Sequence, residues 1–279
     1  MRRVDPKVYT EEYYLTDCTG YNEYKKTFGE ELEIRFLEIK DYLKVTRQDK
    51  VLDIGCGRGE LVYYTARQGA DSYGIDYSDS AIKLALKLRN KKPQNVRLKM
   101  NFKKMDAKSL AFPTSFFSLV VLTDVVEHLY DEELDQVFSE IKRVLAPNGK
   151  LIIHTAPNRW FNDYGYKYYS YPLSTIVVLA WNIFRRSKYP NILHPSKLRT
   201  DSHSIMHINE PTYFSLRKLY RKYKFSGKLY STNITVKKPV ISKKDTLMNV
   251  FIFLHPASKY FPLNVLFGSD FVSVLKNIK

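Results

Sequence analysis

The sequence predicts an α/β fold with a doubly wound, mostly parallel sheet, an N-terminal helical cap and an insertion after the fifth strand. Three observations support this prediction. Apolar runs of strand length alternate with amphipathic helical segments between residues 46 and 158. A glycine-rich turn joins the first of these runs to the first of these helices. Residues 117–123 form a continuous apolar run, as expected for a strand that is buried on both faces.

The first predicted elements lie on either side of the glycine-rich turn. Apolar residues recur every three or four positions over residues 28–44, which indicates an amphipathic helix. Residues 50–54 are predicted to be a buried strand that ends at the turn, and residues 60–68 the helix that follows it. Residues 72–76 are expected to form a second strand, and Ser78 is expected to cap the next helix.

The remaining core elements follow the same alternation. Strictly alternating apolar residues predict a third strand over 96–102, and residues 117–123 are the fourth. Apolar residues on one face predict a helix over 134–145. A turn at 146–149 is then expected to lead into a fifth strand at 150–155.

The chain divides into four predicted parts. Residues 1–45 form a helical cap, whose aromatic stretch near residues 13–21 is either a lid or a strapped-down terminus. Residues 46–158 form the core, and residues 159–210, rich in aromatic residues and prolines, form the insertion. Residues 211–279 are expected to complete the sheet with strands at 225–236 and 269–275, and to contain an apolar insertion near 246–267.

The net charge of +16 is concentrated in the C-terminal part of the chain. Residues 1–158 have a balance of +1, whereas residues 159–279 hold 20 Lys and Arg against 5 Asp and Glu, a balance of +15. A field of one sign attracts nucleic acid, acidic lipid headgroups or phosphorylated substrates. A basic surface that serves solubility alone is the alternative. Cys18 and Cys56 do not suggest a disulfide framework, and the N-terminus does not read as a secretory signal, so we expect a cytoplasmic protein.

The glycine-rich turn is the strongest indication of function. Gly55, Gly57 and Gly59 allow the backbone to approach a ligand closely, although this pattern alone fits a dinucleotide equally well. The preceding strand carries Asp53, and the second strand ends in Asp76, whose carboxylate can accept both hydroxyls of a ribose. The glycine spacing departs from G-x-G-x-x-G, which favours S-adenosylmethionine over NAD.

As a set, these motifs resemble those of the class I S-adenosylmethionine-dependent methyltransferases, which have a Rossmann-like fold. VLDIGCGRGE (51–60) is similar to their glycine-rich motif, and YGIDYS (73–78) to their ribose-binding strand end. KMDAKSLAF (104–112) resembles the segment that meets the adenine. LVVLTDVVEHL (119–129) resembles the fourth strand with its loop, and APNGKLIIHTAPN (146–158) the fifth strand.

The resemblance implies S-adenosyl-L-methionine as cofactor and a role for each matching residue. Asp53 is expected to orient the turn and approach the methionine amino group, and Asp76 to bind the ribose hydroxyls. Asp106 is expected to accept a hydrogen bond from the adenine amino group, and Thr123 and Asp124 to face the methionine portion. The full implied set is Asp53, Gly55, Cys56, Gly57, Asp76, Tyr77, Asp106, Ala107, Thr123 and Asp124.

Three histidines are the candidate catalytic residues. Methyl transfer needs a general base only where the acceptor must lose a proton. His128 follows the fourth strand, and its alternative role is that of a structural residue bonded to backbone. His203 and His207 form a second candidate pair in the insertion. Together with Glu127 these histidines could in principle assemble a metal site, but they show no ligand motif of fixed spacing, so no metal is predicted. His154 is expected to be a packed core residue.

An apolar run in the insertion bears on the acceptor. Residues 168–184 are uncharged and precede Arg185, Arg186 and Lys188. Because the run contains a proline and polar residues, we expect an interfacial helix, or a buried lid or dimer helix, rather than a membrane span. The layout resembles the ubiquinone-biosynthesis O-methyltransferases, which place a membrane-touching insertion after the fifth strand. It also resembles methyltransferases of bacterial surface-glycan and natural-product pathways.

The sequence therefore predicts a methyltransferase that acts on a hydroxyl or amine of a small acceptor. Anionic, lipid-linked and glycosylated acceptors stay open, and peripheral membrane contact is an accompanying hypothesis. The other class is an RNA-directed methyltransferase, or a non-catalytic protein that binds nucleic acid or membrane through its basic half. No recognisable RNA-binding module supports nucleic acid as a partner. The oligomeric state stays open.

Overall fold

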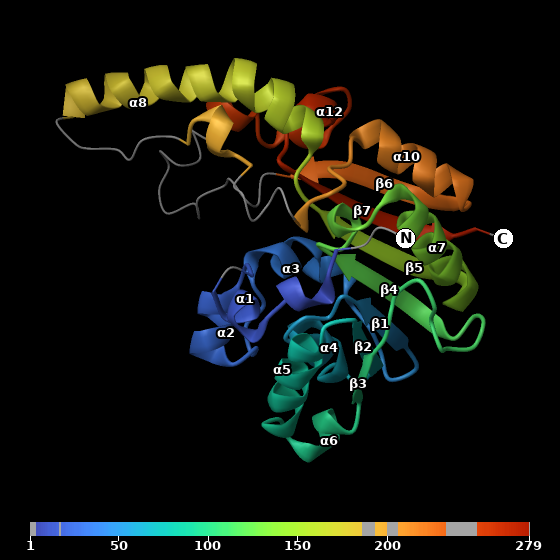
Figure 1. Cartoon of the computed structure of the whole chain (residues 1–279). Coiled ribbons are helices and arrows are strands. Elements are labelled where there is room, and N and C mark those ends of the chain that lie inside the picture. The colour runs from blue at the N-terminus through green and yellow to red at the C-terminus, as the bar shows by residue number, and fades with distance from the viewer. Residues whose placement is uncertain (1–3, 17, 186–192, 200–205, 233–249, 279) are drawn as a thin grey trace.

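A seven-stranded sheet forms the centre of the molecule in the computed structural model, which describes residues 4–16, 18–185, 193–199, 206–232 and 250–278 (Figure 1). The strand order is β3-β2-β1-β4-β5-β7-β6. The strands are β1 (Lys50–Ile54), β2 (Asp71–Asp76), β3 (Met100–Lys104), β4 (Phe117–Thr123), β5 (Leu145–Thr155), β6 (Phe225–Thr232) and β7 (Asp270–Asn277). Strands β1 to β5 pair in parallel, and β7 runs antiparallel to both β5 and β6. The predicted doubly wound, mostly parallel sheet is confirmed.

Helices cover both faces of this sheet. The helical segments of the core are α4 (Glu60–Ala66), α5 (Asp79–Asn90), α6 (Gln94–Arg97), η3 (Val126–His128), α7 (Asp131–Val144) and α10 (Tyr213–Lys222). Those of the N-terminal cap are η1 (Pro6–Val8), α1 (Glu11–Thr16), α2 (Tyr21–Thr27), α3 (Ile34–Ile39) and η2 (Lys40–Tyr42). Those of the later part are η4 (Phe161–Ser170), α8 (Tyr171–Arg185), η5 (Pro195–Lys197), η6 (Ala257–Lys259) and α12 (Leu263–Leu266).

Alternate residues of the central strands pack into two separate apolar clusters. Leu52 and Val120 lie in the cluster that contains the buried faces of α7 and α10. Val51 and Val121, their neighbours along the same strands, lie in the cluster formed with α3 and α4. Successive side chains of a strand point to opposite faces, so the continuous apolar sequence of β4 fills both clusters.

Three predicted elements have different boundaries in the structure. The strand expected at 150–155 is longer, because β5 begins at Leu145 and includes residues 146–149, which were expected to form a turn. The helix expected over 28–44 begins only at α3, because Phe28 and Gly29 have φ values of 49° and 76° and end α2 instead. The strand expected over 96–102 begins only at β3, because Pro93 precedes the short helix α6 and Leu98 is 67% exposed. Four alternating apolar residues were too few to separate a strand from a helical turn.

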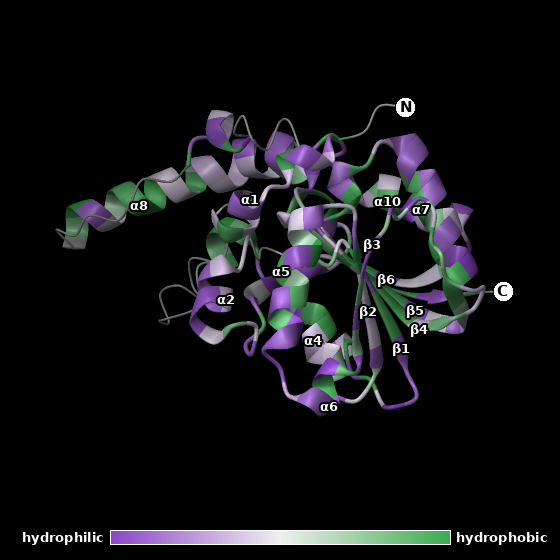
Figure 2. Ribbon diagram, turned by 60° about the horizontal axis from the view of Figure 1, so that its bottom comes forward, coloured by the Kyte–Doolittle hydropathy of each residue, from purple (hydrophilic) through white to green (hydrophobic). Residues whose placement is uncertain are grey.

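The C-terminal part completes the sheet as expected. The predicted strands at 225–236 and 269–275 correspond to β6 and β7. The insertion after β5 is more regular than its sequence indicated, since the π-helical segment η4 continues into α8. Helix α8 projects from the body of the molecule (Figures 1 and 2). Within the described ranges no helix is both long and apolar enough to cross a bilayer.

Candidate active site

A cavity of about 430 Å³ lies at the carboxyl ends of the parallel strands, where the strand order reverses between β1 and β4. This switch point is where open α/β sheets bind ligands. The volume lies in the range of small-molecule and cofactor sites. Of the cofactor residues implied by the sequence, all but Asp53 line it, namely Gly55, Cys56, Gly57, Asp76, Tyr77, Asp106, Ala107, Thr123 and Asp124.

Asp76 provides a buried carboxylate at the end of β2. Its Oδ2 accepts a hydrogen bond from the Gly57 amide at 3.1 Å, and its Oδ1 accepts one from the Ser78 amide at 2.9 Å. Each oxygen accepts more than one hydrogen bond, so the carboxylate can also receive two hydroxyls of a ribose. Burial raises the pKa of Asp76 to about 6. The carboxylate is therefore charged at neutral pH and becomes protonated in mildly acidic solution.

The glycine-rich turn after β1 exposes main-chain atoms to the cavity. The amides of Gly55 and Cys56 both donate to the Ile75 carbonyl at 2.9 Å, which ties the turn to β2. Gly55 has a φ of 74°, and a Cβ there would lie 2.5 Å from a methyl of Val125. Only glycine fits this position without displacing its neighbours.

Asp53 lies behind this turn rather than on the cavity surface. Its side chain is buried, and its Oδ1 has no hydrogen-bond partner among the described residues. Burial raises the pKa of this carboxyl well above its ordinary value, and the nearby charges of Asp76 and Glu60 add to the rise. Its expected approach to the methionine amino group stays a prediction.

The aromatic N-terminal stretch covers the cofactor side of the cavity. Tyr9 and Tyr14 both line it, and the Tyr9 ring packs edge-on against Tyr77 with centroids 5.4 Å apart. The Ser78 hydroxyl donates to the Tyr9 carbonyl at 2.9 Å. Arg58 donates to the Tyr14 carbonyl at 2.8 Å. Hydrogen bonds and aromatic packing therefore hold the cap against the core next to the cavity.

Arg35 of α3 was not singled out from the sequence, yet its side chain enters the cavity. Its guanidinium forms ion pairs with Glu33 and with Asp124 at the end of β4. Asp124 has a left-handed φ of 54° and also contacts His154 Nδ1 at 2.7 Å. Arg35 adjoins the apolar face of its helix, and nothing in its spacing indicated that it reaches the site. A guanidinium here could hold a carboxylate such as that of the methionine portion.

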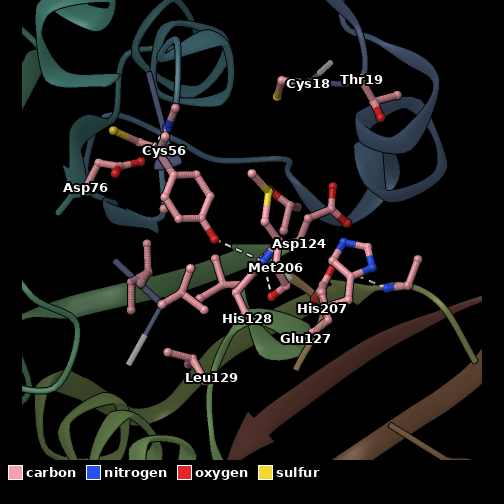
Figure 3. A pocket seen from close by; sticks show the side chains of 18 of the residues that line it. Cys18, Thr19, Cys56, Asp76, Asp124, Glu127, His128, Leu129, Met206 and His207 are labelled. Atoms are coloured by element: carbon pink, nitrogen blue, oxygen red, sulfur yellow. Dashed lines mark hydrogen bonds between the residues drawn. The ribbon is translucent and has the colours of Figure 1, made fainter. Parts of the chain in front are cut away.

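The opposite side of the cavity brings together three candidate residues (Figure 3). Glu127 and His128 lie on η3, and His207 comes from the insertion. The rings of His128 and His207 are edge-to-face with centroids 4.9 Å apart. Glu127 is 1% exposed, and burial raises its pKa to about 7. His128 and His207 are therefore neighbours, and their catalytic roles stay predictions.

The other candidate histidines are placed differently. His203 lies outside the described residues, so its predicted catalytic role stays a prediction. His154 is fully buried within β5, as expected, and burial lowers its pKa. His154 has a structural role at the site, because its contact with Asp124 orients the carboxylate that also pairs with Arg35.

Comparison with known proteins agrees with this geometry. Residues 52–153 match the family model of a methyltransferase domain. The chain contains a class I S-adenosylmethionine-dependent methyltransferase domain. Its sequence is 31% identical over 154 residues to the demethylmenaquinone methyltransferase of Lactobacillus johnsonii, covering 53% of this chain and 55% of that protein. It is 30% identical over 152 residues to the ubiquinone biosynthesis O-methyltransferase of Coxiella burnetii, covering 53% and 58%.

The chain thus spans little more than half the length of these methyltransferases. A solved S-adenosylmethionine-dependent methyltransferase of Methanosarcina mazei superposes with a TM-score of 0.52 at 20% identity, covering 86% of this chain and 97% of that one. That likeness concerns the fold alone, and its coverage exceeds the matched domain.

The residues present fit S-adenosylmethionine as the cofactor of this domain. The buried Asp76 carboxylate suits a ribose, and the exposed backbone around Gly55 leaves room for close approach. Asp106 and Ala107 lie on the same cavity wall, where the adenine is expected. Arg35 and Asp124 offer opposite charges for the zwitterionic methionine portion.

Proposed function

We propose that the protein transfers a methyl group from S-adenosylmethionine to a hydroxyl of a small, lipid-linked acceptor. The observation that carries the proposal is the two-sided cavity. Asp76 and the other predicted cofactor residues around it lie on one side, and Glu127, His128 and His207 lie on the other (Figure 3). Bound S-adenosylmethionine would supply an activated methyl group for the acceptor oxygen, and the proton of the hydroxyl would pass to a neighbouring base or to water.

The protein's contribution is orientation and exclusion of water. Tyr9 and Tyr14 cover the cofactor side, and Met206 and Leu198 of the insertion line the cavity beside the acceptor. We infer that the acceptor hydroxyl binds beside His128 and His207, whose rings are neighbours in the cavity. The bond between Tyr9 Oη and His128 Nδ1, 3.0 Å long, joins the cap to the acceptor side.

The proposal of a lipid-linked acceptor is supported by the exposed apolar face of α8, a helix within the insertion. Ile176, Leu179 and Ile183 of α8 are each more than 60% exposed and lie on one face of the helix. Exposed apolar surface of this kind marks sites that meet lipid or protein. The names of two relatives refer to quinones, one to demethylmenaquinone and the other to ubiquinone biosynthesis. The RNA-directed alternative has only the charge of residues 159–279 in its favour.

Transfer of a radioactive methyl group tests this proposal. The protein is incubated with labelled S-adenosylmethionine and with hydroxylated aromatic compounds that carry or lack an isoprenoid chain. We expect label in the prenylated hydroxyl compounds, and little in the unprenylated ones. Label in an amine or in RNA instead would overturn the acceptor assignment.

A variant pair tests the cofactor assignment separately. Asp76→Ala should weaken binding of S-adenosylhomocysteine by about 2 kcal/mol, or roughly 30-fold, because charge-assisted bonds to two hydroxyls are lost. Asp79→Ala is the matched control, since Asp79 is an exposed carboxylate paired with Lys104 outside the cavity. Calorimetry that shows equal affinity for the two variants would contradict the placement of the ribose.

A further inference from the structure

We propose that Glu127, His128 and His207 form a binding site for a first-row divalent cation of the Zn²⁺ type, on the acceptor side of the cavity. One potential ligand atom of each residue lies within 4.8 Å of those of the other two. Two imidazoles and one carboxylate, with a further position open, make up the ligand set of many catalytic zinc sites. No sequence spacing indicated this site, because His207 reaches it from the insertion after β5.

The carboxylate of Glu127 has the surroundings of a cation ligand. It is 1% exposed, and its hydrogen-bond donors are neutral: the Thr155 hydroxyl at 2.8 Å from Oε2 and the Ala156 amide at 3.5 Å from Oε1. A buried charge is ordinarily paired or bound to a metal. The Thr155 bond also orients the carboxylate, as partners of metal ligands do.

The contacts of His128 select the tautomer that a cation requires. Its Nδ1 lies 3.0 Å from the Met206 carbonyl and 3.0 Å from the Tyr9 hydroxyl. A carbonyl can only accept, so Nδ1 carries the proton and Nε2 carries the lone pair. Metal-binding histidines commonly donate their second ring nitrogen to a carbonyl in this way.

The segment that carries His207 is fixed against η3. The Asn209 amide donates to the Glu127 carbonyl at 3.0 Å, and the Asn209 side chain donates to the Leu129 carbonyl at 3.2 Å. The third ligand is therefore held near the other two. Ligands 2.0–2.1 Å from a tetrahedral Zn²⁺ lie roughly 3.4 Å apart, so the cluster must contract by side-chain rotation when it binds the ion.

The donor set also selects the kind of cation. Imidazole nitrogen suits Zn²⁺ and its first-row neighbours, whereas Mg²⁺ prefers oxygen ligands. In the open position the ion would hold the acceptor hydroxyl and lower its pKa, so that its proton passes to water before the oxygen is methylated. This role of the ion rests on the proposed function, whereas the binding of the ion does not.

Titration of the metal-free, untagged protein with Co²⁺ tests the site directly, with visible absorption as the readout. We expect one Co²⁺ per chain, displaced by Zn²⁺ and not by Mg²⁺. Glu127→Gln and His207→Ala should each weaken binding by at least about tenfold. His194→Ala is the matched control, because His194 is exposed on η5 and bonded to Ser196. Wild-type affinity no higher than that of the two cluster variants would overturn the proposal.

Binding of S-adenosylhomocysteine, measured in the same samples, separates the two proposals. All four proteins should bind it equally, because the cofactor wall is unchanged. If the wild type binds it but binds no Co²⁺, the cation site fails and the proposed function stands. If a cluster variant loses both ligands, X-ray absorption of the zinc-loaded wild type decides instead, and a ligand shell without imidazole overturns the site.

Discussion

The ionisation of Asp76 is expected to make cofactor binding depend on pH. Burial raises its pKa to about 6, although the Ser78 and Gly57 amides oppose that rise. Only the ionised carboxylate offers charge-assisted bonds to both ribose hydroxyls. The affinity for S-adenosylhomocysteine should therefore fall as pH decreases through 6, by about tenfold per unit well below that pKa.

Calorimetric titrations between pH 8 and pH 5 check this dependence. An Asp76→Asn variant supplies the control, because its side chain cannot ionise and its weaker affinity should vary little over the same range. An undiminished wild-type affinity at pH 5 would show that the carboxylate is not a ribose ligand, or that its pKa is not raised.

At the residue scale, contiguous motifs could be predicted and long-range contacts could not. The predicted cofactor residues belong to motifs at strand ends, and all but Asp53 line the cavity. Arg35 reaches the site because α3 packs against the sheet, and the sequence of α3 alone does not specify that packing. The meeting of His207 with Glu127 likewise depends on how the insertion folds back onto η3.

At the scale of elements, α8 has the exposed apolar face expected of a helix that lies on a membrane surface. Phe184 is 85% exposed, and Leu179 61%. Among the basic residues expected to flank the helix, Arg186 and Lys188 lie outside the described residues. The charge balance of +15 for residues 159–279 favours an anionic surface. Peripheral contact with such a surface stays our prediction for this helix.

Sedimentation with vesicles of phosphatidylglycerol and phosphatidylcholine tests the role of α8. The protein should sediment with these vesicles at low salt and be released as salt rises, because the attraction is screened. Leu179→Ser should weaken the binding, and so should joint neutralisation of Arg185, Arg186 and Lys188. Leu98→Ser is the matched control, with a similarly exposed leucine near α6. Equal sedimentation of the two serine variants would argue against membrane contact through α8.

Elements with a continuous pattern were predicted well, and those with a short pattern were not. The apolar sequence of β4 specifies a buried central strand whatever surrounds it. The four alternating apolar residues over 96–102 were ambiguous, and after Pro93 the first of them lies in the short helix α6. Helix α8 was one of several alternatives in the sequence, because its apolar face suited a buried helix as well as an exposed one.

At the scale of the whole molecule, one buried arginine makes several of the contacts that join the N-terminal cap to the core. Arg58 follows the glycine-rich turn and is 3% exposed. It pairs with Glu60 at 3.1 Å and donates at 2.8 Å to the carbonyls of Tyr14 and Thr19. Its guanidinium also lies over the ring of Tyr24, 5.3 Å from the centroid. One side chain thus connects the cofactor turn to α1, to α2 and to the loop between them.

Replacement of Arg58 should therefore loosen the cap and destabilise the fold together. Arg58→Met leaves the Glu60 carboxylate buried without this partner, a change that typically costs about 3–5 kcal/mol. We expect a lower Tm and faster amide exchange in α1 and α2, with β1 and β4 still protected.

Adding Glu60→Leu should recover much of the Tm without restoring protection of the cap, because the carbonyls of Tyr14 and Thr19 still lack their donor. Arg89→Met in α5, whose arginine donates to the Arg97 carbonyl away from the cap, should change neither quantity. Exchange in α1 that is unaltered by Arg58→Met would show that the aromatic packing of Tyr9 and Tyr14 holds the cap in place without the arginine.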